Sequence, residues 1–163
     1  MLSRTIGETA RPRAFETILL GGLSAGVLDG LDAVVFYDLA FGVTPTLLFQ
    51  HIASGLLGPR SFHGGWYTTL LGGACHFSIA IGAAAVFYGA SLVIPVLFRR
   101  PWICGPAFGI LVYLFMHYIV VPLSAVTRRT VPATGFEILD QLFSHTMFVG
   151  LPIALMARRS ARS

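Results

Sequence analysis

The chain has 163 residues, of which 55% are hydrophobic and only 11% are charged, and its mean hydropathy is +0.78. Soluble domains carry about 25% charged residues, so this composition excludes a soluble domain and indicates an integral membrane protein. The formal net charge of +4 comes from eleven basic residues, all of them arginine. They lie near the ends of apolar stretches rather than along one surface, which argues against nucleic-acid binding.

Four apolar stretches reach the length of roughly 20 residues that a helix needs to cross the hydrocarbon core of a bilayer. The loops between them are short, which favours antiparallel neighbours. We therefore predict an all-α fold, in which residues 1–163 form one domain of a polytopic membrane protein, a four-helix transmembrane bundle. The predicted spans cover about residues 15–37, 67–98, 102–124 and 136–157.

The first span carries three glycines at four-residue spacing, Gly22, Gly26 and Gly30. At about 100° per residue they form one narrow stripe of small residues, which lets two membrane helices approach closely. This helix-packing stripe serves another helix of the chain, a second copy in a homo-oligomer, or a membrane partner. Asp29 lies on the packed side of the same helix, whereas Asp32 faces either a neighbouring helix or the polar rim.

A short helix is predicted between the first and second spans. Its start is marked by Thr44 as the N-cap and Pro45 at the first helical position, and its end by Gly58 and Pro59. Apolar residues recur within it at helical spacing, which is typical of a helix that lies in the membrane interface.

Each of the three remaining spans contains one histidine: His76, His117 and His145. A charged side chain at the centre of a membrane helix costs roughly 2.5–3.5 kcal/mol on insertion scales. Together with Asp29 and Asp32, the three histidines therefore predict a polar interior site shared by the four helices. A rise of about 1.5 Å per residue from the arginines at one side puts Asp29, His117 and His145 at roughly 20–25 Å and His76 near 35 Å.

Three interpretations of this site remain open. Imidazole and carboxylate groups suit a metal ion, with His76, His117 and His145 as the candidate ligands. The same groups exchange protons, which favours a site that binds or passes a proton. Alternatively, the protein is a structural or accessory membrane subunit whose polar side chains only stabilise helix packing.

A narrower form of the metal interpretation is a haem with two histidine ligands, for which His117 and His145 are the pair to consider. The chain has no HExxH or CxxC motif and no two histidines four residues apart, so the sequence leaves the metal or cofactor unknown. Serines within the spans lie in no recognisable nucleophile motif. We therefore expect no enzymatic activity.

A family resemblance is carried by three segments: HFSIAIGAAAVFY, YLFMHYIVVPLSAV and FEILDQLFSHTMFVGLPIALMARR. They make residues 68–159 similar to the YagU-like group of small bacterial inner-membrane proteins, a family without an established activity. The resemblance implies a multi-span fold with histidines at His76, His117 and His145. It assigns no catalytic or binding residues, and the family has no acidic residue matching Asp29 or Asp32.

The resemblance also implies localisation in the bacterial inner membrane, and the arginines give an orientation through the positive-inside rule. Placing both termini in the cytoplasm leaves eight of the eleven arginines inside and three outside, namely Arg60, Arg128 and Arg129. We therefore predict a multi-pass inner-membrane protein with cytoplasmic N- and C-termini. Its expected contacts are the lipid bilayer and, through the glycine stripe, a second copy or a membrane partner.

Overall fold

The computed structural model describes residues 10–126 and 133–161, and within them it contains helices and no strand. Four helical rods are long and apolar enough to cross a membrane. The prediction of an all-α, polytopic membrane protein is therefore confirmed. The four rods are Ala14–Phe41, Gly65–Val93, Pro101–Leu123 and Gly135–Ser160.

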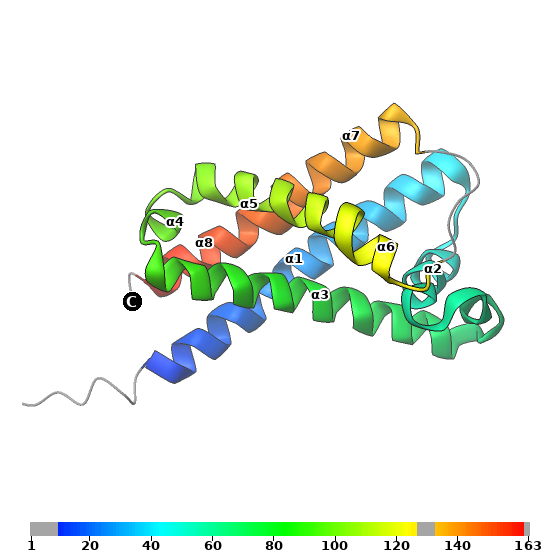
Figure 1. Ribbon diagram of the computed structural model, residues 1–163, viewed down its shortest axis with the longest axis horizontal. Helices are drawn as coiled ribbons and strands as arrows, with labels where there is room; N and C mark the ends of the chain where they lie inside the picture. Colours follow the sequence, from blue (N-terminus) through cyan, green and yellow to red (C-terminus); the bar gives the residue numbers. More distant parts are fainter. Residues whose placement is uncertain (1–9, 127–132, 162–163) are drawn as a thin grey trace, which may run out of the picture.

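The first two rods are the single helices α1 (Ala10–Phe41) and α3 (Gly65–Val93). The third runs through α5 (Pro101–Phe115), η2 (Met116–Val120) and α6 (Val121–Leu123). The fourth runs through α7 (Gly135–Ser144), η3 (His145–Gly150) and α8 (Leu151–Ser160). Helix α1 packs against both α3 and α8, and α5 packs against η3 and α8 (Figure 1). The start of α1 and the end of α8 therefore lie at the same end of the bundle.

The short helix predicted after the first span is α2 (Pro45–Leu57), which lies at the opposite end of the bundle and packs against α3 (Figure 1). It begins as expected, because the Thr44 hydroxyl accepts a hydrogen bond from the Leu47 N–H at 3.4 Å. It ends at Gly58, whose φ of +59° is a conformation that favours glycine. A 3₁₀ turn, η1 (Gly58–His63), then leads into α3.

The second membrane helix is shorter than the predicted stretch of residues 67–98. Helix α3 ends at Val93 because Pro95 supplies no N–H to continue the helix and restricts the residue before it. The apolar residues that follow form a separate turn, α4 (Val96–Arg99), before Pro101 starts α5. The chain thus reverses direction through a short helix between two prolines.

Glycines set the closest helix approaches. A Cβ atom at Gly22 would lie 2.5 Å from the Ile81 Cα, and one at Gly26 would lie 2.6 Å from the ring of Phe77. The glycine stripe of α1 is therefore covered by α3 of the same chain, and it is not open to a second copy or partner in this structure. A second close crossing joins the third and fourth rods through Gly105, Gly109 and Gly150.

The apolar core lies toward the end of the bundle where α8 finishes. Phe87 of α3 and Ile153 of α8 are almost completely buried there, together with Ala25 of α1. Phe108 of α5 packs against the same cluster, with its ring centroid 5.0 Å from that of Phe87. All four rods contribute to this half, so polar side chains that need partners are concentrated in the other half.

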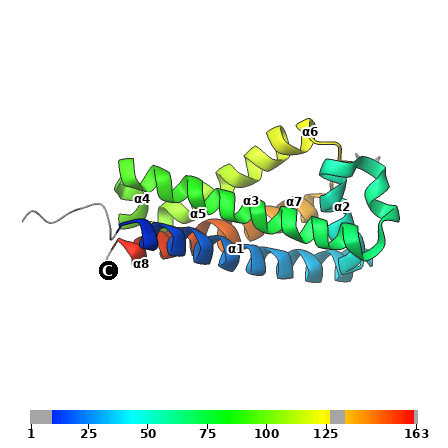
Figure 2. The same cartoon turned by 90° about the horizontal axis from the view of Figure 1, so that it is seen from below.

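The third and fourth rods each contain a wider π-helical stretch, η2 and η3, and each stretch ends two residues before a proline, Pro122 or Pro152. A proline within a helix lacks an N–H and its ring crowds the carbonyl four residues earlier, which the wider turn relieves. Beyond η2, α6 diverges from the bundle toward α2 (Figure 2). The Ala125 N–H donates to the Gly55 carbonyl at 2.9 Å, which ties the end of this rod to α2.

Candidate functional site

Helix α7 presents a polar face toward α1. Its start is fixed by a reciprocal cap, in which the Glu137 N–H donates to Thr134 Oγ1 at 3.2 Å and the Thr134 N–H donates to Glu137 Oε2 at 3.0 Å. At about 100° per residue, side chains one, four and five positions apart share one side of a helix. Four polar residues follow this spacing at the α7–η3 junction: Asp140, Gln141, Ser144 and His145.

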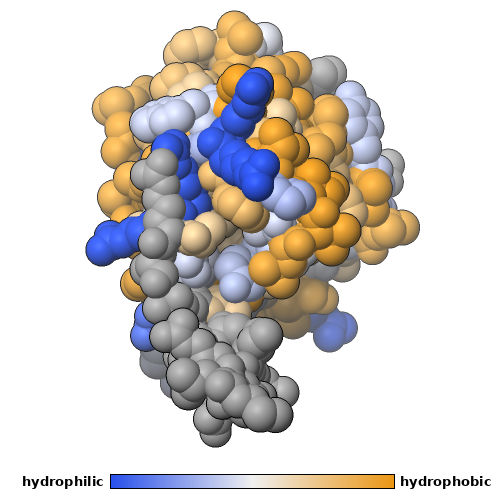
Figure 3. Space-filling model, turned by 90° about the vertical axis from the view of Figure 1, so that its left-hand side faces the viewer, coloured by the Kyte–Doolittle hydropathy of each residue, from blue (hydrophilic) through white to orange (hydrophobic). Residues whose placement is uncertain are grey.

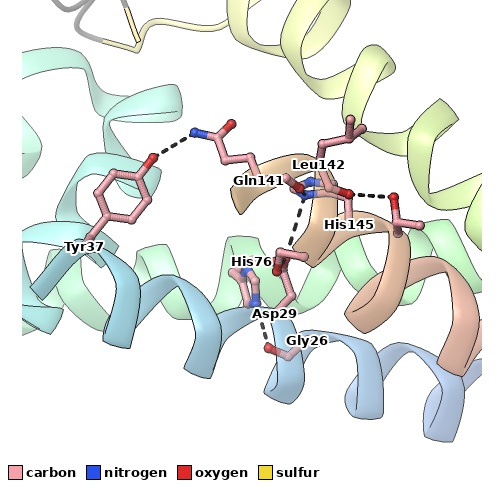
Figure 4. Close-up of polar contacts among 9 residues, drawn as sticks. Gly26, Asp29, Tyr37, His76, Gln141, Leu142 and His145 are labelled. Carbon is pink, nitrogen blue, oxygen red and sulfur yellow. Dashed lines mark hydrogen bonds and ion pairs between the residues drawn. The ribbon is translucent and has the colours of Figure 1, made fainter. Parts of the chain in front are cut away.

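Asp29 of α1 contacts this polar face. The Ser144 hydroxyl donates a hydrogen bond to Asp29 Oδ1 at 2.8 Å. His145 Nδ1 lies 3.8 Å from the same oxygen (Figure 4). Only 16% of the Asp29 side chain and 20% of the His145 side chain are exposed. The structure thus brings together two residues of the predicted site, an aspartate of the first span and a histidine of the fourth.

A further contact of His145 decides which ring nitrogen carries the hydrogen. His145 Nδ1 lies 2.9 Å from the main-chain carbonyl oxygen of Gln141. Because a carbonyl oxygen only accepts hydrogen bonds, Nδ1 carries the hydrogen and donates it. The Nε2 atom of the neutral ring then keeps its lone pair. Nε2 can therefore accept a hydrogen bond, while Nδ1 stays within 3.8 Å of Asp29 Oδ1.

A second hydrogen bond joins α1 to α7 two helical turns away. The Gln141 side-chain amide donates to the Tyr37 hydroxyl oxygen at 2.8 Å (Figure 4). Both links connect residues more than 100 positions apart in the sequence. They fix the rotation of the fourth rod against the first.

Asp32 and Asp140 complete a set of three carboxylates. The negative charge of Asp140 interacts with the charges of Asp32 and Asp29. Asp32 Oδ2 is buried without a hydrogen-bond partner, and neither Asp32 nor Asp140 forms a side-chain hydrogen bond or ion pair with residues 10–126 or 133–161. We call Asp29, Asp32, Asp140 and His145 the polar layer. At 1.5 Å per residue, its members lie about 8–18 Å from the helix ends nearest α2.

His76 meets α1 beside the polar layer without joining it. Its Nε2 lies 2.8 Å from the carbonyl oxygen of Gly26, so this nitrogen carries the hydrogen and donates it (Figure 4). Gly30 makes room for the ring, because a Cβ atom there would lie 3.1 Å from Nε2. Within the described parts of the chain, no hydrogen bond or ion pair links His76 to Asp29 or His145. The depth mismatch expected for His76 is therefore absent, since it reaches α1 within one turn of Asp29.

His117 stands outside the polar layer. It lies on the exposed side of η2, where its ring stacks on Tyr113 at a centroid distance of 5.8 Å. The buried Tyr113 ring also meets His145 edge-on at 5.7 Å. A haem ligated by His117 and His145 would therefore require Tyr113 to move, and the geometry lends this pair no support as haem ligands.

The side chains of the predicted site do not form a set of metal ligands in the described residues. Among the residues that the structure describes, no three His, Cys, Asp or Glu side chains are grouped so that they could hold one. His76, His117 and His145 accordingly have three different surroundings: a carbonyl of α1, a tyrosine ring, and the carboxylate of Asp29.

Sequence reasoning missed Asp140 and Ser144. It singled out His145 on the fourth span. Gln141 and His145 lie four residues apart and form one stripe, but that stripe is narrower than the helix face that α1 contacts. Widening that stripe by one position, to residues 140 and 144, adds both residues at the same spacing. The signal was therefore present as an aspartate inside the fourth predicted span, one position from the stripe of His145.

The comparisons with known proteins add no relative: no family model, no curated protein and no solved structure matches the chain. The resemblance to YagU-like proteins stays a prediction.

Proposed function

We propose that the polar layer binds protons within the membrane. The observation that carries the proposal is the state of Asp32 and Asp140, two carboxylates in membrane-spanning helices that interact unfavourably and have no hydrogen-bond or ion-pair partner in the described chain. A charged aspartate in such a helix costs roughly 2.5–3.5 kcal/mol, so carboxylates without partners need a reason other than packing. A proton neutralises one of them and, unlike a metal ion, needs a single oxygen atom.

The charge balance of the polar layer also favours the uptake of protons. The layer contains three carboxylates and one imidazole, so it has an excess of negative charge even when His145 is protonated. Electrostatic repulsion between carboxylates is relieved when they share protons. His145 Nε2 offers a further acceptor one ring away from Asp29. The polar layer is thus suited to holding more than one proton.

A structural role is the second candidate, and a different set of contacts favours it. The Ser144–Asp29, Gln141–Tyr37 and His76–Gly26 hydrogen bonds each join two helices. Such bonds contribute about 0.6–1.7 kcal/mol each in membrane proteins. They account for Asp29 and His76, but they leave Asp32 and Asp140 unexplained. The structural role therefore concerns Asp29, whereas proton binding concerns Asp32 and Asp140.

Infrared difference spectroscopy tests the proposal on the full-length protein in lipid vesicles. Acidifying the sample should produce the carbonyl stretch of a protonated carboxylic acid, and the frequency of that band rises when the group lacks hydrogen-bond donors. We expect a high-frequency component, because Asp32 Oδ2 is buried without a donor. A spectrum that contains only the band of solvated carboxylic acids would contradict the proposal.

We further propose that the protein resides in the bacterial inner membrane with both termini in the cytoplasm. The arginine distribution supports this orientation, and the shared location of the start of α1 and the end of α8 is consistent with it (Figure 1). A fluorescent reporter that matures only in the cytoplasm, fused after Ser163, should be bright. Alkaline phosphatase is active only outside the cytoplasm. A dark reporter fusion together with an active phosphatase fusion at the same position would place the C-terminus outside and contradict the proposed orientation.

A further inference from the structure

Arginines from two elements gather at the end of the bundle opposite α2. Arg99 is the last residue of α4 and Arg100 follows it, while Arg158 lies in the last turn of α8. Helix α4 packs against α8. Figure 3 views this end, where hydrophilic residues stand among apolar ones. We call Arg99, Arg100 and Arg158 the arginine end.

Packing and hydrogen bonds hold the main chain around these arginines. Leu97 of α4 packs against the apolar core, whose members include Ala157, the neighbour of Arg158. The Cys104 thiol donates to the Val96 carbonyl oxygen at 3.6 Å, and Pro101 is buried. The chain reversal at α4 is thus held against the end of α8, which keeps Arg99 and Arg100 close to Arg158.

The part of the chain that the structure describes does not neutralise the arginine end. None of its three guanidinium groups forms a hydrogen bond or ion pair within residues 10–126 and 133–161, and Glu16 is the one acidic residue of those ranges at this end. Trp102 follows directly in the sequence and is 65% exposed. Tryptophan in a membrane protein is enriched at the level of the lipid headgroups. The unpaired arginines therefore lie at the depth at which lipid phosphates are found.

We propose that the arginine end binds the headgroup of an anionic phospholipid. A guanidinium group matches the geometry of a phosphate and donates two parallel hydrogen bonds to it. Three such groups beside one another favour a headgroup with net negative charge over a zwitterionic one, whose own cation would be repelled. The partner is thus a lipid of the surrounding bilayer rather than dissolved phosphate, because the site lies at the headgroup level and is fixed there by the helices.

The test measures lipid selectivity at the protein surface. Full-length protein is placed in phosphatidylcholine vesicles that contain spin-labelled phosphatidylglycerol or spin-labelled phosphatidylcholine, and the motionally restricted fraction of each label gives its relative association constant. Wild type should prefer the anionic label. We expect each arginine to raise the relative association constant of the anionic label about fivefold. The double variant R99Q/R100Q should therefore weaken the preference by roughly 25-fold and R158Q by about fivefold. The control is Arg60→Gln, an exposed arginine of η1 at the other end, which should keep the wild-type preference.

Each outcome decides the proposal. It is overturned if wild type shows no preference, if R99Q/R100Q and R158Q both keep the full preference, or if R60Q loses as much as they do. Inorganic phosphate added at constant ionic strength should leave the preference unchanged, and displacement of the lipid by it would identify free phosphate as the ligand. The measured preference does not depend on which way the protein inserts into the vesicle, because the spin-labelled lipids occupy both leaflets. If the double variant fails to reach wild-type helix content, R158Q alone decides.

Discussion

Replacing Asp32 by asparagine should abolish the high-frequency carboxylic-acid band, whereas Asp38→Asn should leave it unchanged. Asp32 Oδ2 is buried without a hydrogen-bond donor, while Asp38 is exposed on the same helix six residues later. The two variants remove the same chemical group from the same helix, so they differ in surroundings alone. Infrared difference spectra of both proteins in vesicles, recorded between alkaline and acidic buffer, give the result. Loss of the band in both variants, or in neither, would show that Asp32 is not its source.

The sign of the stability change separates proton binding from a structural role. At alkaline pH, Asp32→Asn should raise the free energy of unfolding by about 1 kcal/mol or more, because it removes a charge that has no partner in the described chain. At the same pH, Asp29→Asn should lower it by about 1 kcal/mol, because it weakens the hydrogen bond that the Ser144 hydroxyl donates to Asp29. Unfolding in detergent mixtures, followed by circular dichroism, measures both. If Asp32→Asn destabilises the protein as Asp29→Asn does, Asp32 has a structural role.

Substituting Gly22 by alanine should lower the free energy of unfolding by about 1–3 kcal/mol, the usual cost of overpacking. The new methyl carbon would lie 2.5 Å from the Ile81 Cα and 2.9 Å from the Ile81 nitrogen, and main-chain atoms cannot rotate out of the way. Helices α1 and α3 must then separate, which also loosens the contact of His76 with Gly26. The same unfolding assay, with helix content checked before unfolding, gives the value.

Gly82→Ala is the matched control for this substitution. Gly82 also lies within a membrane helix, and a Cβ atom there would meet nothing within 4 Å. It should change stability by less than about 1 kcal/mol, with a small gain from the better helix propensity of alanine. Equal effects at Gly22 and Gly82 would mean that the close approach of α1 to α3 contributes little to stability.

The fold could be predicted from the sequence because a bilayer leaves few choices. Within a bilayer, long apolar stretches can form all their main-chain hydrogen bonds only as helices. The N-cap Thr44 and the C-cap Gly58 of α2 were each predicted from a single residue type. The break at Pro95 was not predicted, because apolar residues continue on both sides of it and hydropathy alone does not register a missing N–H.

The candidate site was predictable only in part, because its geometry depends on helix rotation. The sequence singled out Asp29 and His145, which the structure brings within 3.8 Å of each other. It could not separate them from His117, since a rise per residue gives depth but not direction, and the ring of His117 points to the exposed side of η2. Asp140 was overlooked because it lies next to the stripe of His145 rather than on it.

The apolar core has a consequence for how charge can move through a single chain. Between the polar layer and the arginine end, residues 17–28, 77–98, 101–116 and 146–157 contain no Asp, Glu, His, Lys or Arg. The shortest of these stretches corresponds to about 18 Å of helix, far beyond the reach of one proton transfer. If the polar layer binds a proton as proposed, no carboxylate or imidazole of these stretches relays that proton to the arginine end, so its exchange is expected on the side of the membrane near α2.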